Sequence, residues 1–212
     1  MASPLTVYSS AADGMLQGNH AAYATARTTG GTITLDNSTA IGIVGQRYAT
    51  TYFCWETFYS WDTSTLPAGC TIDSATISIY LQDDQTDTDF TANIRACDWG
   101  TSLAAGDWVS GASLSALTLL ASKSTVGIAV NAYTVFTSEA ALLTNINRSG
   151  ETRVVVCSSR HEAGDTPTGI ERFRPYTVEK GTTYRPRLVV NYTEAATGCP
   201  KMTDHYARLR RG

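Results

Sequence analysis

The sequence of 212 residues contains few charged side chains, few histidines and few prolines. Asp, Glu, Lys and Arg together make up 17% of the residues, and the chain has three histidines and six prolines. The formal net charge of −3 argues against a nucleic-acid-binding protein, because such proteins carry a basic surface. A hydrophobic content of 42% at this low charge excludes an intrinsically disordered chain. We therefore expect a folded globular protein that does not bind nucleic acid.

Paired cysteines, a secretion signal and a long apolar run are also missing. The five cysteines are widely spaced and form no CxxC pair, so the sequence predicts no zinc site. The opening stretch MASPLTVYSS has neither the basic region nor the apolar region of a signal peptide. No apolar run approaches the length of a membrane span. We expect a protein that is made in the cytoplasm, binds no cofactor and has no membrane contact.

Short strand-like runs separated by Gly, Ser, Asp and Thr dominate the sequence. The aromatic run 51–61 is apolar on both faces, which places it at the centre of a sheet. Residues 137–150 combine a Ser or Thr N-cap candidate, helically spaced apolar residues and a final Gly, which predict one short helix. The pattern as a whole predicts an all-β fold, an antiparallel two-sheet β-sandwich (jelly roll) with one short helix. Its other strands are expected at 40–46, 75–82, 90–99, 126–136 and 152–159.

The stretch YRPRLVVNYT, residues 184–193, has the features of a closing strand. Pro186 cannot donate to a strand ladder, so it belongs at the start of the strand, and apolar residues alternate after it. The sequence therefore predicts a sandwich domain over 1–193 and a C-terminal tail over 194–212. We expect the tail to contact a partner, because arginine forks pair with carboxylates. The predicted contact residues are Lys201, Tyr206, Arg208, Leu209, Arg210 and Arg211.

Three stretches together resemble a known family. They are FYSWDTSTLPAGCTIDSATISIYLQ (58–82), VFTSEAALLTNINRSGETRVVVCSSR (135–160) and YRPRLVVNYT (184–193). Their order and spacing resemble the DNRLRE-type jelly rolls, a carbohydrate-binding-module-like β-sandwich family of bacterial secreted proteins. The resemblance spans roughly residues 5–193 and implies a sandwich, here in a bacteriophage virion version because the secretion signal is missing. The motif that names the family is absent, so function has to be argued from the residues.

Two clusters of polar residues suggest catalysis or metal binding. The stretch SSRHEAGD (158–165) places a serine, a histidine and two carboxylates in one loop, which invites a catalytic-triad interpretation. No nucleophile elbow surrounds it, so we predict no catalytic residue and a non-enzymatic protein. The acidic loop QDDQTDTD (82–89) offers oxygen ligands for Ca²⁺ but lacks the EF-hand glycine and distal glutamate, which favours a solvated loop without metal. The weak calcium candidates are Asp83, Asp84, Asp87 and Asp89.

Two further patterns bear on binding. Trp99, Trp108 and Tyr176 have polar neighbours, as a sugar-stacking surface requires, although tryptophans beside strands are commonly core residues. In ERFRPY (171–176), two arginines lie near Glu171 and Glu179. This second pattern favours an ion-pair network at the surface or at a subunit contact over an anion-binding site.

These features favour a structural protein of an assembled particle. An adhesion-type sandwich, no secretion signal, no convincing catalytic cluster and a surplus tail fit a bacteriophage capsid decoration (cement) protein, or another virion surface component such as a tail protein. We therefore expect location in the virion and contact with other virion proteins, namely the major capsid protein or tail proteins. Copies of the chain itself are further expected partners, because many jelly rolls form symmetric oligomers. The alternative is a carbohydrate-binding module or adhesin of a phage tail or bacterial surface, with a host glycan as ligand.

Overall fold

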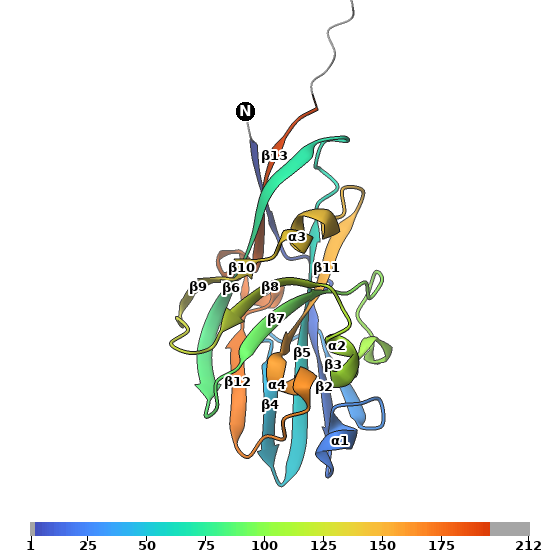
Figure 1. Ribbon diagram of the computed structural model, residues 1–212, viewed down its shortest axis with the longest axis vertical. Coiled ribbons are helices and arrows are strands. Elements are labelled where there is room, and N and C mark those ends of the chain that lie inside the picture. Colours follow the sequence, from blue (N-terminus) through green and yellow to red (C-terminus); the bar gives the residue numbers. More distant parts are fainter. Residues whose placement is uncertain (1–2, 196–212) are drawn as a thin grey trace, which may run out of the picture.

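The computed structural model describes residues 3–195, which are mostly β-structure (Figure 1). The predicted all-β, sandwich-like fold is confirmed. The strands are β1 (Ser3–Tyr8), β2 (Gly14–His20), β3 (Thr32–Asp36), β4 (Val44–Ala49), β5 (Thr51–Asp62), β6 (Thr71–Thr86), β7 (Thr91–Ala96), β8 (Leu119–Ser124), β9 (Ala132–Val135), β10 (Thr137–Ser138), β11 (Glu151–Ser158), β12 (Ile170–Pro175) and β13 (Arg187–Thr193). The helices are α1 (Tyr23–Ala26), α2 (Gly111–Leu114), α3 (Ala140–Asn145) and α4 (Ser159–Ala163), with 3₁₀ turns η1 (Ala105–Asp107), η2 (Val178–Lys180) and η3 (Thr182–Tyr184).

The long strand β5 joins two branches of the sheet. Its first half pairs with β4, and that branch continues through β12 to β6. Its second half pairs with β11, and that branch continues through β7 and β8 to β10. Strand β2 pairs with β5 over residues 52–58, a stretch that overlaps both the residues paired with β4 and those paired with β11. Strands β4 and β11 must therefore both lie along the other edge of β5, one after the other. The sheet forks where β4 ends and β11 begins. Helix α4 follows β11 directly and lies between the two branches in Figure 1.

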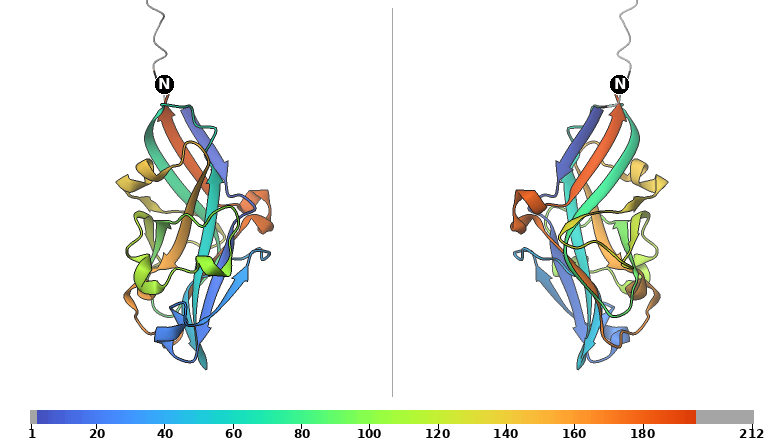
Figure 2. Two further views of the ribbon diagram at one scale, coloured as in Figure 1. Left: turned by 90° about the vertical axis from the view of Figure 1, so that its right-hand side faces the viewer. Right: turned by 90° about the vertical axis from the view of Figure 1, so that its left-hand side faces the viewer.

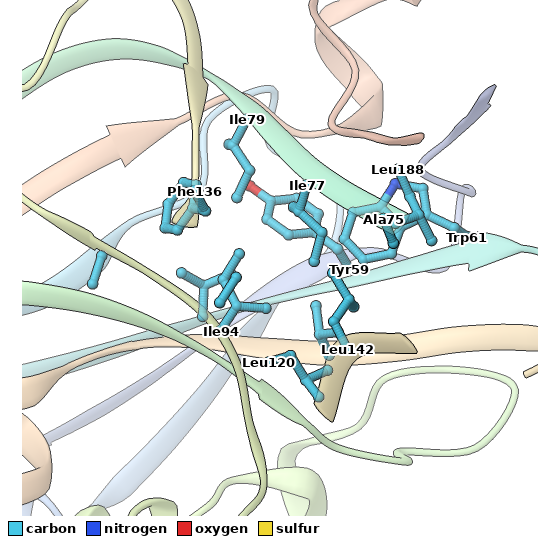
Figure 3. Close-up of a cluster of buried hydrophobic side chains, with 14 of the residues drawn as sticks. Tyr59, Trp61, Ala75, Ile77, Ile79, Ile94, Leu120, Phe136, Leu142 and Leu188 are labelled. Atoms are coloured by element: carbon cyan, nitrogen blue, oxygen red, sulfur yellow. The ribbon is translucent and has the colours of Figure 1, made fainter. Parts of the chain in front are cut away.

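The main core lies between the two branches. Figure 3 shows Tyr59 and Trp61 of β5 together with Ile77 and Ile79 of β6, opposite side chains from the β7–β8 branch and from α3. Alternation explains this arrangement, because residues two apart in a strand point to the same face. Each such fully buried apolar side chain contributes about 1.5–3 kcal/mol to folding.

A second core covers the other face of β5 and β11. Cys54 and Phe58 of β5 and Val155 of β11 point into it. The connection between β7 and β8, which includes η1 and α2, folds back over these strands and supplies further buried side chains. The aromatic strand is therefore buried on both faces along much of its length, as its sequence predicts.

The stretch 184–193 forms the strand expected of it. Pro186 precedes β13, which pairs with β6 along one edge and with β1 along the other. Strands β1, β6 and β13 lie together at one end of the elongated molecule in both views of Figure 2, and the β4–β5 turn lies at the other end in Figure 1.

Two local predictions differ from the structure. The expected strand 126–136 is limited to β9, because residues 125–131 form a turn in which Gly127 and Asn131 have positive φ angles. The helix expected within 137–150 is α3, but its N-cap is Glu139 rather than Ser or Thr. The other three helices have four or five residues each, too few to show a helical period in the sequence.

Candidate functional site

The two tryptophans considered for sugar stacking are core residues. Trp99 and Trp108 are only 4% and 5% exposed and belong to the second core. Of the two interpretations of these rings, burial agrees with the core one and leaves neither ring free to stack on a sugar. The cause is the connection between β7 and β8, which folds over β5 and β11 and turns its tryptophans inward. Tyr176 is 8% exposed and has a different environment, described below.

The four calcium candidates are engaged by protein groups, and Asp84 and Asp89 share the Thr86 hydroxyl as a donor. Asp83 pairs with Arg174, and the other three carboxylates accept hydrogen bonds from backbone amides or threonine hydroxyls. No group of three or more His, Cys, Asp or Glu side chains suited to a metal ion is found within residues 3–195. The candidates are Asp83, Asp84, Asp87 and Asp89.

The stretch SSRHEAGD spans the end of β11 and α4, and its polar side chains are directed to different partners. The Ser159 hydroxyl accepts a hydrogen bond from the Thr91 amide, and Asp165 lies 3.5 Å from the Arg160 guanidinium. Glu162 binds Arg95, while His161 is fully buried. These side chains do not form a triad, because one turn of helix points successive residues in different directions.

A residue that the sequence analysis missed lies beside His161. Glu56, from the aromatic strand β5, is fully buried, and its Oε1 lies 3.9 Å from the histidine Nδ1. Burial raises the pKa of Glu56 well above its usual value despite a hydrogen bond from the Val109 amide. Burial, helped by the charge of Arg27, lowers the pKa of His161 to about 3. Both shifts favour the uncharged forms, and both side chains are closed off from solvent.

Replacing Glu56 with glutamine is expected to flatten the pH dependence of stability. A raised carboxyl pKa means that the folded state holds its proton above the unfolded pKa of about 4.3. Glu56 therefore stabilises the fold fully below that pH, and its contribution falls by up to about 1.4 kcal/mol per pH unit as the pH rises toward the folded pKa. Urea denaturation at several pH values should show Glu56→Gln gaining stability relative to the parent as pH rises. Glu139→Gln, at an exposed position, serves as the control; equal slopes for all three proteins would contradict the prediction.

A buried ion-pair cluster fills the space beside α4. Glu162 accepts hydrogen bonds from the Arg95 Nε at 2.5 Å, from the side-chain Nδ2 of Asn93 at 3.0 Å and from the Cys157 thiol at 3.1 Å. Although burial alone raises the pKa of Glu162, these hydrogen bonds outweigh it and hold the pKa below its usual value. The carboxylate thus ties β7, β11 and α4 together.

The outer face of the β2–β5–β4–β12–β6 layer carries aromatic rings and cations. We call this surface the outer face; its central residues are Gln17, Arg47, Phe53, Trp55, Gln85 and Arg172. The Phe53 and Trp55 rings are stacked with centroids 5.6 Å apart. The Arg47 guanidinium lies 4.5 Å from the Phe53 centroid, and the Arg172 guanidinium lies 5.3 Å from the Trp55 centroid. Strand alternation and pairing bring these residues together from β5, β4 and β12.

Four tyrosines extend the outer face past Arg174. Tyr176 lies within 5.6 Å, centroid to centroid, of both Tyr80 and Tyr184, and Tyr133 lies 5.2 Å from Tyr80. The Lys180 ammonium stands 4.9 Å from the Tyr176 centroid. Tyr176 itself is buried by its neighbours, whereas Tyr80, Tyr133 and Tyr184 are partly exposed. This cluster presents partly exposed aromatic rings to solvent, unlike Trp99 and Trp108, although the single tyrosines Tyr8 and Tyr48 are more exposed, at 48% and 44%.

The ion pairs expected for ERFRPY differ from those observed. Glu171 points to the opposite face from Arg172 and binds Arg160 at 2.8 Å. Arg174 pairs with Asp83, and Arg172 donates to the neutral Gln85. Glu171 is therefore not a partner of either arginine in its own strand, because adjacent residues in a strand point to opposite faces.

Two shallow hollows occur elsewhere on the surface. One, of about 250 Å³, is lined by Arg153 and by the two carboxylates that pair with it, Asp98 and Glu151. The other, of about 900 Å³, lies between Gly69–Ile72 and α3, close to Ala195. The predicted contact residues of the tail, from Lys201 to Arg211, lie outside the described residues.

Comparison with family models and with curated proteins gives no match for this chain. Among residues 3–195, no helix is both long and apolar enough to cross a membrane. The assignment of function therefore depends on the outer face and on the fold.

Proposed function

We propose that this protein is a non-enzymatic structural component of an assembled particle, foremost a capsid decoration protein of a bacteriophage or another virion surface component. The observation that carries the proposal is the outer face. It is a sheet surface on which arginines lie over Phe53 and over the buried ring of Trp55, and on which partly exposed tyrosines cluster. Tyr, Trp and Arg are the residues enriched at the centres of protein–protein interfaces. A surface of this composition suits docking on another protein.

The buried polar clusters support the same proposal. The carboxylates and the histidine most able to carry chemistry, Glu56, His161 and Glu162, are enclosed between the sheet branches and the helices. They contribute to the fold, and an enzyme would need such groups at an open cleft. The proposal accordingly assigns the protein a binding role through its surface.

The proposal predicts that the chain is found on purified particles in a fixed number of copies. Quantitative mass spectrometry of particles, purified from the host that produces the chain, measures this number, and electron microscopy with an antibody locates the copies on shell or tail. A second arm compares reassociation of the full chain with that of a chain ending at Glu194. We expect the shorter chain to lose most of its occupancy, because the tail is predicted to contact a partner. Particles that lack the chain would contradict the proposed function.

The tyrosine cluster favours a second candidate, a carbohydrate-binding module or adhesin. Tyr80, Tyr133 and Tyr184 are partly exposed, and rings with polar rims can stack on sugars. Against it, the Tyr133 hydroxyl is already bound to the carbonyls of Thr183 and Arg185. A glycan array with the full chain distinguishes this candidate from the first.

A further inference from the structure

Arg47 and Arg172 form a pair of guanidinium groups without an acidic partner. They belong to adjacent strands, β4 and β12, and both lie near Trp55, at 5.5 Å and 5.3 Å from its ring centroid. Gly45 is opposite both Trp55 and Arg172 in the strand register. Since glycine has no side chain, the arginine can extend across it to the ring.

The charges of this pair are not neutralised within residues 3–195. Arg47 makes no ion pair there and donates no side-chain hydrogen bond, and its Nε is buried without a partner. Arg172 donates its Nε and Nη2 to one neutral oxygen, Oε1 of Gln85, at 3.0 and 2.8 Å. The next arginine in β12, Arg174, is paired with Asp83. Arg47 and Arg172 therefore differ from the other outer-face arginine in having no carboxylate.

The electrostatics of the pair agree with the geometry. Burial lowers the pKa of Arg172, and the nearby positive charges of Arg47 and Arg174 lower it further, while Asp83 acts in the opposite direction. Two like charges held close together on a half-buried face repel each other, and a bound anion relieves that repulsion. An arginine side chain is a permanent cation in proteins, so the pair offers lasting positive charge to a ligand.

The chemistry of the site selects carboxylates on a protein. A planar guanidinium binds carboxylate oxygens through two parallel hydrogen bonds, and stacking on an aromatic ring fixes its orientation beforehand. A sugar would need a free ring face, but Arg47 lies over Phe53 and both arginines lie over Trp55. Gln17 and Gln85 add neutral hydrogen-bonding groups on either side. This combination fits Asp or Glu side chains presented by a partner surface.

We propose that Arg47 and Arg172 bind an acidic segment of a partner protein, with their stacked guanidiniums pairing with its carboxylates. The proposal names the partner chemistry of the outer face and rests on the proposed function for the identity of the partner. It assigns the central contact to β4 and β12, separate from the predicted contact of the tail.

The first test measures binding of the full chain to poly-L-glutamate by isothermal titration calorimetry. We expect binding that weakens at high salt, and at least a tenfold loss in the double variant Arg47→Gln/Arg172→Gln. The charge-matched control is Lys123→Gln/Arg148→Gln, which removes two cations that form no ion pair within residues 3–195. Lys123 lies in β8, and Arg148 lies in the loop between α3 and β11. The control should change the affinity by less than about twofold, since exposed charges act weakly at a distance.

A conservative variant distinguishes the loss of positive charge from the loss of the planar guanidinium geometry. Arg47→Lys/Arg172→Lys keeps both charges but lacks the planar guanidinium group. Its affinity for poly-L-glutamate should therefore lie between those of the parent and the glutamine variant. Circular dichroism and thermal unfolding establish that each variant is folded. Equal binding by the parent and a folded glutamine variant would overturn the proposal, as would an equal loss in the control.

The second test uses purified particles and a sulfated polysaccharide. If the chain occupies particles and the glutamine variant does so equally well, this inference fails while the proposed function stands. If the chain is absent from particles, the proposed function fails and the poly-L-glutamate result decides this inference alone. Arginine-dependent binding to the sulfated polysaccharide without binding to poly-L-glutamate would overturn the assignment of an acidic protein segment as the ligand.

Discussion

Replacing Glu162 with alanine is expected to lower the free energy of unfolding by about 3–5 kcal/mol. The Glu162 and Arg95 side chains are only 9% and 10% exposed, and the carboxylate binds Arg95 through both Nε and Nη2. Without it, the guanidinium stays buried with the Leu117 carbonyl as its remaining partner. An uncompensated buried charge costs far more than the pair contributes. Urea denaturation of the purified full chain measures the difference.

The matched control for this substitution is Glu151→Ala. Glu151 also pairs with an arginine, Arg153 at 2.9 Å, but it is 27% exposed. Water screens such a pair, so the control should lose no more than about 1 kcal/mol. The double variant Glu162→Ala/Arg95→Met should recover part of the loss, because it removes the buried charge as well. Similar losses for Glu162→Ala and Glu151→Ala would show that the buried pair has no special role.

The same carboxylate should make stability sensitive to acid. Its pKa is lowered in the folded state, so its contribution is present above the unfolded pKa of about 4.3 and is lost as the pH falls through the folded value. This dependence has the opposite sign to that of Glu56. The two carboxylates therefore act in different pH ranges, although both lie beside α4.

Replacing Gly45 with alanine is expected to destabilise the fold by about 2–5 kcal/mol, from backbone strain and overpacking together. Gly45 has a φ angle of +131°, which L-residues rarely adopt. A Cβ there would lie 2.8 Å from the Arg172 Cα and 3.0 Å from its Cβ, in the middle of the β4–β12 pairing. Thermal or urea unfolding measures the loss, and neither neighbouring strand can move away without breaking its own ladder.

Two other glycines separate the causes. Gly181 has a φ angle of +104° and no atom within 4 Å of an added Cβ, so Gly181→Ala reports strain alone. Gly106 has open space around it and no positive φ, so Gly106→Ala should be neutral or slightly stabilising. We expect the loss to be greatest for Gly45, smaller for Gly181 and absent for Gly106. A loss at Gly45 no larger than that at Gly181 would contradict the steric part of the argument.

The local patterns in the sequence were sufficient for the fold class and for the main strands. Alternation in 75–82 and the doubly apolar run 51–61 depend on neighbours along the chain, and both stretches form strands, within β6 and β5. Their boundaries and the one-turn helices were not predictable in the same way. A helix of four residues, such as α2, completes barely one turn and leaves no period to detect.

The site could not be predicted because its residues meet through long-range pairing. Glu56 is a single carboxylate in the aromatic run TYFCWETFYSW with no local pattern to mark it, and its neighbour His161 comes from a different element. Arg47 and Arg172 become adjacent only when β4 pairs with β12. The sequence allowed both a core and a surface interpretation of Trp99 and Trp108, and the way the β7–β8 connection folds decides between them.

The fork at β5 has a consequence for how the protein loses its structure. This strand is hydrogen-bonded along both edges and contributes side chains to both cores. Neither core can be opened without exposing the strand on which the other depends. The two sheet branches should therefore melt together in one cooperative transition, without a half-folded intermediate in which one core survives alone.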